Sequence, residues 1–282
     1  MIIDSHQHFW DLERVEYPWL VPAYGPIYRS FHPDELRPQL TAAGVDRTVL
    51  VQAANSFADT DAMLAQAAAE PWIGAVIGWV PLEDAASAAR ALDDRYLAEP
   101  KYRGVRHLNH NEPDPDWLIR PDVMAGLREL EARRLVFEVV AVYPLHLGHV
   151  PTLARALPGL RIVIDHLAKP PIASRDLAAW KRDLAVAAAH PNVFAKISGL
   201  NTAADWAAWT PEDLVEPIGH AIDVFGADRL MAGSDWPVAI LAGDYQRVWT
   251  ATERALTLLG VSDPDRAAIL GGTAAAVYAI GD

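Results

Sequence analysis

The chain has 282 residues, of which 51% are hydrophobic, and its formal net charge is -13. This length and composition allow one large buried core, and we expect a single domain spanning residues 1–282. The negative charge argues against nucleic acid as a partner, because its phosphates would be repelled. We find no apolar run of membrane-spanning length and no leader pattern, so we expect a cytoplasmic protein without a membrane partner. Because the sequence contains no cysteine, any metal must be held by histidine and carboxylate side chains.

The first apolar run of the chain ends in the motif His6-Gln7-His8. Side chains alternate between the two faces of a β-strand, so His6 and His8 point to the same side. Two imidazoles placed in this way can converge on a metal ion or on a reacting oxygen. Two polar residues that merely end a strand explain the motif equally well. The rest of the chain must therefore decide between these interpretations.

Seven further apolar runs follow, separated by stretches rich in alanine and leucine. They cover residues 48–53, 75–80, 102–107, 136–140, 161–166, 193–198 and 230–235. Such continuous apolar character is typical of parallel strands that are covered on both faces. Helix signals lie between the runs: Thr210-Pro211 begins a helix that should end near Gly226, Asp122 begins another, and residues 262–271 form a third. Eight strands alternating with helices predict an α/β fold, the (β/α)8 TIM barrel.

One interval, residues 9–47, is longer than a single loop and helix require. It carries five large aromatic side chains, Trp10, Tyr17, Trp19, Tyr24 and Tyr28. We expect these rings to form a flap over the mouth of the barrel. The alternative is that they only pack against its outside.

In TIM barrels the C-terminal ends of the strands converge on one mouth, where the chemistry takes place. The polar residues at these ends are His6, His8, Gln52, Arg106, His107, Tyr143, His166, Ser198 and Asp235. Histidines can bind a metal or polarise a carbonyl, and an aspartate can take a proton from water. Each residue alone would more often be structural. Together, the histidines and Asp235 predict a hydrolytic site.

Three motifs lie at strand ends: His6-Gln7-His8, Asp165-His166-Leu167-Ala168-Lys169-Pro170 and Gly233-Ser234-Asp235-Trp236-Pro237. Together they resemble the amidohydrolase superfamily, in particular its amidohydrolase-2 branch. Within that branch the whole chain is most similar to the sugar-acid lactonases of the L-fuconolactonase and L-rhamnonolactonase group. The resemblance implies a hydrolase of carbohydrate catabolism that opens an aldono-lactone, such as L-fucono-lactone in L-fucose degradation. It also implies that Asp235 is the general base and that His6, His8 and His166 surround the lactone carbonyl.

The resemblance leaves the metal content open. Metal-rich members of the superfamily carry a bridging lysine or glutamate on the fourth strand and a histidine on the fifth, but residues 105–107 and 137–143 supply neither. We therefore expect no two-metal centre. One divalent ion, zinc or manganese, could be held by His6, His8 and Asp235, with Glu138 as a candidate fourth ligand. Lactonases of this branch also work without an essential metal, and the histidines and Tyr143 would then donate hydrogen bonds.

Five residues are candidates for binding the sugar lactone: Trp10, Arg106, His107, Tyr143 and Trp236. Arg106 could orient a substrate oxygen or hold a loop carboxylate such as Glu112. Trp10 and Trp236 flank the histidine and aspartate motifs and could form a wall against the sugar, or could only close the core.

Three charged residues beside these candidates have structural interpretations. Glu138 and Lys196 lie inside strands, where we expect a buried ion pair. Asp165 should point away from His166 and support the structure. We assign no role to the remaining histidines, and the sequence does not indicate an oligomeric state.

Two rival functions remain. The first is a metal-dependent decarboxylase of the same superfamily, against which the missing fifth-strand histidine counts. The second is an inactive binding protein on the same scaffold. It is disfavoured because His6, His8, His166 and Asp235 occur together.

Overall fold

The computed structural model describes residues 1–281, and its centre is one sheet of eight parallel strands whose order follows the chain. The strands are β1 (Ile3–Gln7), β2 (Arg47–Val51), β3 (Ile73–Gly78), β4 (Tyr102–His107), β5 (Val136–Val139), β6 (Arg161–Ile164), β7 (Val193–Ile197) and β8 (Leu230–Ala232). The two outer strands also meet. Just beyond them, the N–H of Asp235 donates to the carbonyl of His6, and the N–H of His8 donates to the carbonyl of Trp236, both at 2.8 Å. The sheet thus curls round on itself, which confirms the predicted (β/α)8 barrel.

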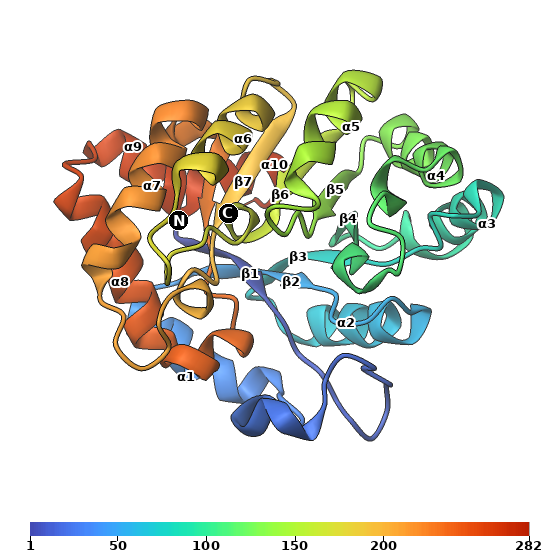
Figure 1. Ribbon diagram of the computed structural model, residues 1–282. Coiled ribbons are helices and arrows are strands. Elements are labelled where there is room, and N and C mark those ends of the chain that lie inside the picture. The colour runs from blue at the N-terminus through green and yellow to red at the C-terminus, as the bar shows by residue number, and fades with distance from the viewer. Residues whose placement is uncertain (282) are drawn as a thin grey trace.

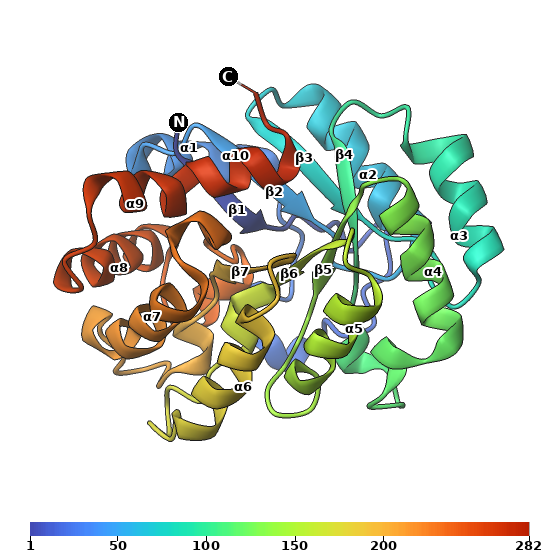
Figure 2. The ribbon, with the colours of Figure 1, turned by 90° about the horizontal axis from the view of Figure 1, so that it is seen from above.

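Helices surround this barrel, as Figures 1 and 2 show. They are α1 (Pro33–Ala43), α2 (Phe57–Ala69), α3 (Ala85–Ala91), α4 (Pro121–Ala132), α5 (Val150–Ala156), α6 (Ala178–Ala188), α7 (Pro211–Phe225), α8 (Tyr245–Leu258), α9 (Asp263–Ala267) and α10 (Thr273–Tyr278). The predicted boundaries of α7 are confirmed: Thr210 forms a capping box with Asp213, and Gly226 ends the helix at a φ of 75°. The helix expected over residues 262–271 is α9, continued by a π-helical turn from Ala268 to Gly272.

The interior of the barrel is apolar at one end and charged above it. At the N-terminal ends of the strands, Ile3 and Val136 pack with Val277 and Tyr278 of α10, which covers this end. Above that layer the Tyr278 hydroxyl donates to Glu138 at 2.5 Å. The predicted ion pair of Glu138 with Lys196 is confirmed. Apolar packing therefore closes one end of the barrel, and polar side chains gather toward the other.

Residues 9–31, which we call the flap, run from the end of β1 toward α1. Figure 1 shows this segment in dark blue, looping out beyond β1. The flap is anchored by hydrogen bonds: Trp10 Nε1 donates to the carbonyl of Arg29 at 2.6 Å, and Trp19 Nε1 donates to the carbonyl of Ala53 at 2.7 Å. Tyr17 donates to Asp59 of α2 at 2.9 Å. These bonds give the aromatic residues of the flap definite positions against the barrel.

Candidate active site

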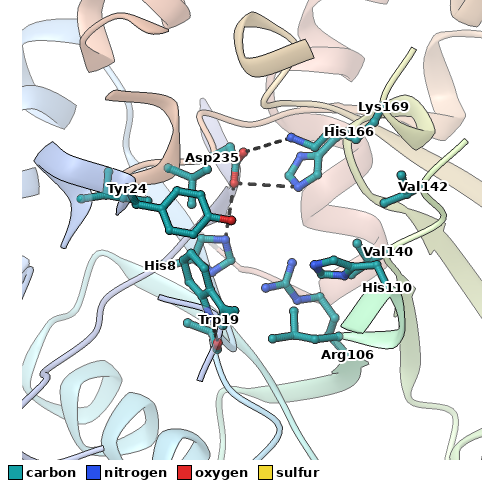
Figure 3. A pocket seen from close by; sticks show the side chains of 14 residues that line it. His8, Trp19, Tyr24, Arg106, His110, Val140, Val142, His166, Lys169 and Asp235 are labelled. Atoms are coloured by element: carbon teal, nitrogen blue, oxygen red, sulfur yellow. Dashed lines mark hydrogen bonds and ion pairs between the residues drawn. The ribbon is translucent and has the colours of Figure 1, made fainter. Parts of the chain in front are cut away.

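A cavity of about 320 Å³ opens at the C-terminal ends of the strands. Its polar lining consists of His8, Arg106, His110, His166, Lys169 and Asp235. Its apolar wall includes Ile27, Leu108, Val140, Val142 and Val238, while Trp19 and Tyr24 reach in from the flap. Figure 3 shows His8, His166 and Lys169 directed toward Asp235, with Arg106 and His110 farther from it. The cavity thus combines a reactive floor with apolar sides.

Asp235 lies at the centre of a ring of histidine nitrogens. Its Oδ1 is 3.7 Å from Nε2 of His6, 3.5 Å from Nε2 of His8 and 3.8 Å from Nε2 of His166. The Nε2 atoms of His6 and His8 are 3.1 Å apart. All four side chains are buried. This arrangement brings together the four residues that the sequence predicted to be catalytic.

Two glycines make room for this cluster. A Cβ on Gly199 would come within 2.4 Å of the Asp235 carboxylate, and a Cβ on Gly233 would meet His6 at 2.9 Å. Asp235 itself adopts a φ of 59°, a left-handed conformation in which its N–H reaches the carbonyl of His6. Backbone shape after β7 and β8 therefore decides where the carboxylate points.

The segment after β6 forms a left-handed turn. His166, Leu167, Ala168 and Lys169 have φ values of 54°, 49°, 62° and 55°. L-residues adopt this conformation only at a cost of about 1–2 kcal/mol each. The turn directs both His166 and Lys169 into the cavity.

The donor atoms fit one divalent metal ion. Nδ1 of His8 is 2.7 Å from the carbonyl of Val51, which fixes the ring proton there and leaves Nε2 free to bind a metal. Nδ1 of His6 is 3.2 Å from Oδ1 of Asp165, and carboxylates commonly orient ligating histidines, but Nζ of Lys196 lies 3.1 Å from the same nitrogen. Four ligands about 2.0–2.1 Å from a tetrahedral ion would be about 3.3–3.4 Å apart, close to the spacings observed here. Asp235 Oδ2 is buried and has no hydrogen-bond partner in residues 1–281.

Burial alone would raise the pKa of the Asp235 carboxyl. The surrounding His166 and the ammonium of Lys169, 3.8 Å from Oδ2, outweigh this effect and hold the pKa well below its usual range. Burial, reinforced by the charges of Lys169 and Arg106, lowers the pKa of His166 to about 3. At neutral pH the site therefore contains an ionised Asp235, the state needed for a base, beside a neutral His166.

The sequence of the whole chain matches the profile of a family described as Amidohydrolase over residues 3–280. The chain belongs to this amidohydrolase family. Two curated relatives, both named L-fucono-1,5-lactonase, come from Burkholderia ambifaria and Burkholderia multivorans. They are 40% and 36% identical to this chain over 99% of its length, and the matches cover 95% and 96% of their own lengths.

Solved structures extend this comparison. An amidohydrolase from Burkholderia multivorans with bound zinc has a TM-score of 0.91 and 35% identity, with all of both chains covered. A dihydroxybenzoic acid decarboxylase from Polaromonas with bound manganese has a TM-score of 0.69 and 17% identity, over 99% of this chain and 96% of its own. The second likeness shows a shared fold and nothing more.

In this amidohydrolase the predicted site residues divide into two groups. His8, Arg106, His166 and Asp235 line the cavity, and His6 lies directly behind His8. The candidates Trp10, His107, Tyr143 and Trp236 do not line it.

Other contacts account for three of these four side chains. His107 lies 2.7 Å from Glu112 and stacks on Trp117. Trp10 packs edge-on against Phe31, and so does Trp236. The substrate-binding roles of these residues remain predictions.

Arg106 and Glu138 also take definite places. Nη1 of Arg106 donates to Asp165 at 3.1 Å, so the arginine holds this carboxylate rather than Glu112. The Arg106 Nε is buried and has no partner in residues 1–281. Glu138 lies 4.0 Å from Nδ1 of His6, on the side of the ring away from Asp235, and is therefore placed poorly as a fourth ligand.

The sequence interpretation missed two polar residues of the cavity. Lys169 is in a quoted motif, but only the left-handed turn directs it inward, and its Nζ donates to Thr202 at 2.9 Å. His110 follows β4 by three residues, in a loop to which we assigned no role. Partial desolvation of the ring at the cavity, with the nearby charges of Arg106 and Lys169, lowers the pKa of His110 to about 4, although the residue is exposed.

Proposed function

We propose that this amidohydrolase opens the lactone ring of a sugar acid, with Asp235 as general base. The substrate class is an aldono-lactone, such as L-fucono-lactone in the degradation of L-fucose. One observation carries the mechanism: an ionised, buried carboxylate lies at the floor of a cavity, between three histidine nitrogens. The sequence relationship to two L-fucono-1,5-lactonases supports the substrate class.

Asp235 takes a proton from a water molecule as the water oxygen bonds to the lactone carbonyl carbon. The carbonyl oxygen gains negative charge in the resulting tetrahedral intermediate. When the bond between this carbon and the ring oxygen breaks, the ring oxygen leaves as an alkoxide and takes the proton back from Asp235. The products are the acid and a hydroxyl group, so one water is consumed and atoms balance.

The Nε2 atoms of His6, His8 and His166 all approach Oδ1 of Asp235, and we assign these histidines to polarising the lactone carbonyl, directly or through a bound ion. His6, His8 and Asp235 would hold one divalent ion, for which zinc is our candidate because a solved relative binds it. When bound, such an ion polarises the carbonyl and lowers the pKa of water. The left-handed turn aims His166 at the same region, and the Arg106 guanidinium, which lines the cavity, could bond to a substrate oxygen.

The decarboxylase alternative has no specific support. The decarboxylase described above shares the fold alone with this chain at 17% identity. Among the described residues, β5 carries Glu138 rather than a histidine, and Lys196 pairs with it. We therefore retain lactone hydrolysis as the function.

The decisive experiment is a pH-indicator assay of sugar-acid lactones with five- and six-membered rings. Metal content is measured on the same sample, and Asp235→Asn serves as the inactive control. Acid release by the wild-type chain that disappears in Asp235→Asn is the expected result. Failure to open any of the lactones would contradict the proposal.

A further inference from the structure

Tyr24 enters the cavity from the flap, directly opposite the catalytic cluster. The ring contacts Trp19 edge-on, with centroids 5.7 Å apart, and lines the cavity beside His8 and Asp235. Figure 3 shows the phenol pointing inward, with its hydroxyl over the space between these two side chains. None of the three motifs quoted above includes this residue, and the sequence identified it only as one of five aromatic groups.

The backbone around Tyr24 fixes this direction. Gly25 has φ 56° and ψ -108°, a combination that is strained for any residue with a Cβ. Nothing lies within 4 Å of the position where that Cβ would be, so the requirement for glycine here is conformational. Pro22 and Pro26 restrict the same short helical segment. These residues therefore restrict the backbone that carries Tyr24.

The hydroxyl of Tyr24 has no hydrogen-bond acceptor among the described residues, unlike the polar groups of three other aromatic residues of the flap. Trp10, Tyr17 and Trp19 each donate to a carbonyl or carboxylate of the protein. Within residues 1–281 the Tyr24 hydroxyl makes no such bond, although it faces a cavity. Tyr24 is 38% exposed, so water can bond to its hydroxyl in the free protein. A substrate that fills the cavity would replace that water as the partner.

We propose that Tyr24 is a substrate-binding residue whose hydroxyl bonds to a ring hydroxyl of the sugar lactone. The inference rests on the proposed function and adds a residue that recognises a hydroxyl group of the sugar. The histidines at the cavity floor polarise the reacting carbonyl, whereas Tyr24 approaches from the rim. Its hydroxyl therefore contacts a part of the substrate that does not change during the reaction. A contact of this kind lowers KM and leaves kcat nearly unchanged.

The test compares two lactones of equal ring size, a six-membered sugar-acid lactone and δ-valerolactone, which has no hydroxyl groups. Tyr24→Phe removes only the phenolic oxygen. It should raise KM for the sugar lactone about tenfold, with kcat within twofold of wild type. With δ-valerolactone the same variant should match wild type within twofold. If δ-valerolactone binds without turnover, its inhibition constant against the sugar lactone replaces KM.

Tyr28→Phe is the matched control, because Tyr28 belongs to the same flap, is 43% exposed and does not line the cavity. Tyr28→Phe should leave KM and kcat unchanged for both lactones. Gly25→Ala should resemble Tyr24→Phe in direction, because it disturbs the backbone that aims the phenol. An unchanged unfolding midpoint in Tyr24→Phe shows that the effect comes from the contact.

Two results would overturn the inference. If Tyr24→Phe treats the sugar lactone as wild type does, the hydroxyl makes no useful contact, although lactone hydrolysis itself still holds. If Tyr24→Phe raises KM equally for both lactones, the Tyr24 ring only packs. A wild-type chain that opens neither lactone removes the proposed function, and this inference with it.

Discussion

The ammonium of Lys196 lies 2.6 Å from Oε2 of Glu138, and both side chains are fully buried inside the barrel. Removing one partner of a buried ion pair typically costs about 3–5 kcal/mol, because the other charge is left uncompensated. We expect Lys196→Met to lower the free energy of unfolding by about this amount in a denaturant titration. Lys181→Met is the control, since Lys181 pairs with Glu216 at the surface, where the loss should stay below about 1 kcal/mol. Equal losses in the two variants would contradict the prediction.

Asp235→Asn preserves the shape of the side chain but cannot accept the proton from water. Loss of a general base typically costs about 10² to 10⁴ in rate. We expect kcat to fall within this range while KM and the unfolding midpoint change little, as measured by steady-state kinetics and thermal unfolding. Asp223→Asn, an exposed change on α7, should behave as wild type. Near-native turnover by Asp235→Asn would place the base elsewhere.

The histidine cluster predicts a specific response to metal removal. Chelation should reduce lactone hydrolysis, and activity should return in proportion to bound zinc, because an ion held by His6, His8 and Asp235 would polarise the carbonyl. His8→Asn should reduce the zinc content of the purified protein, whereas His190→Asn, at the turn before β7, should not. Metal analysis on the assayed sample makes this measurement. Full activity at negligible metal content would show that the histidines act only as hydrogen-bond donors.

The two tryptophans of the flap should respond differently to truncation. Trp19 lines the cavity, so Trp19→Ala should raise KM for a sugar lactone and lower kcat/KM by admitting water. Trp10 is 1% exposed and lies in the core, so Trp10→Ala should instead cost about 3–5 kcal/mol of stability. Kinetics and denaturant unfolding on both variants separate these effects. Unchanged kinetics in a folded Trp19→Ala protein would mean that this ring only packs.

His110 should stay neutral throughout the physiological pH range. Its pKa is lowered to about 4, so the ring gains a proton only when the pH falls below that value. An ordinary histidine in the cavity would instead make KM change with a midpoint near pH 6.5. We expect KM to be flat between about pH 5 and 8 in wild type and in His110→Gln alike. A transition near pH 6.5 that vanishes in His110→Gln would contradict this.

The sequence predicts the barrel well, because each strand is a local apolar run and the strands follow one another in order. It also locates His6, His8, His166 and Asp235, since strand ends converge in this fold. His107 illustrates an overlooked rule: it is adjacent to Arg106 on β4, so the two side chains must face opposite sides. Lys169 could not be placed, because a left-handed turn has no reliable signal in a single sequence.

The flap could be predicted from the sequence only in part. Its aromatic content predicts a flap over the mouth of the barrel, and Trp19 and Tyr24 do reach the cavity. Which rings face inward depends on hydrogen bonds from Trp10 and Tyr17 to distant groups. Those partners are fixed by packing over the whole chain, and no local pattern reveals them.

The bond from Tyr278 to Glu138 bears on how the protein is made on the ribosome. His6 emerges early in synthesis, yet Asp235 and Trp236, which close the barrel against β1, come near the end of the chain, and α10 comes later still. Because a nascent chain grows from its N-terminus, neither the charged layer nor the catalytic ring can assemble until nearly all residues have left the exit tunnel. Nascent chains that end before α10 should therefore remain sensitive to protease, and protection should appear only when the last helix is released.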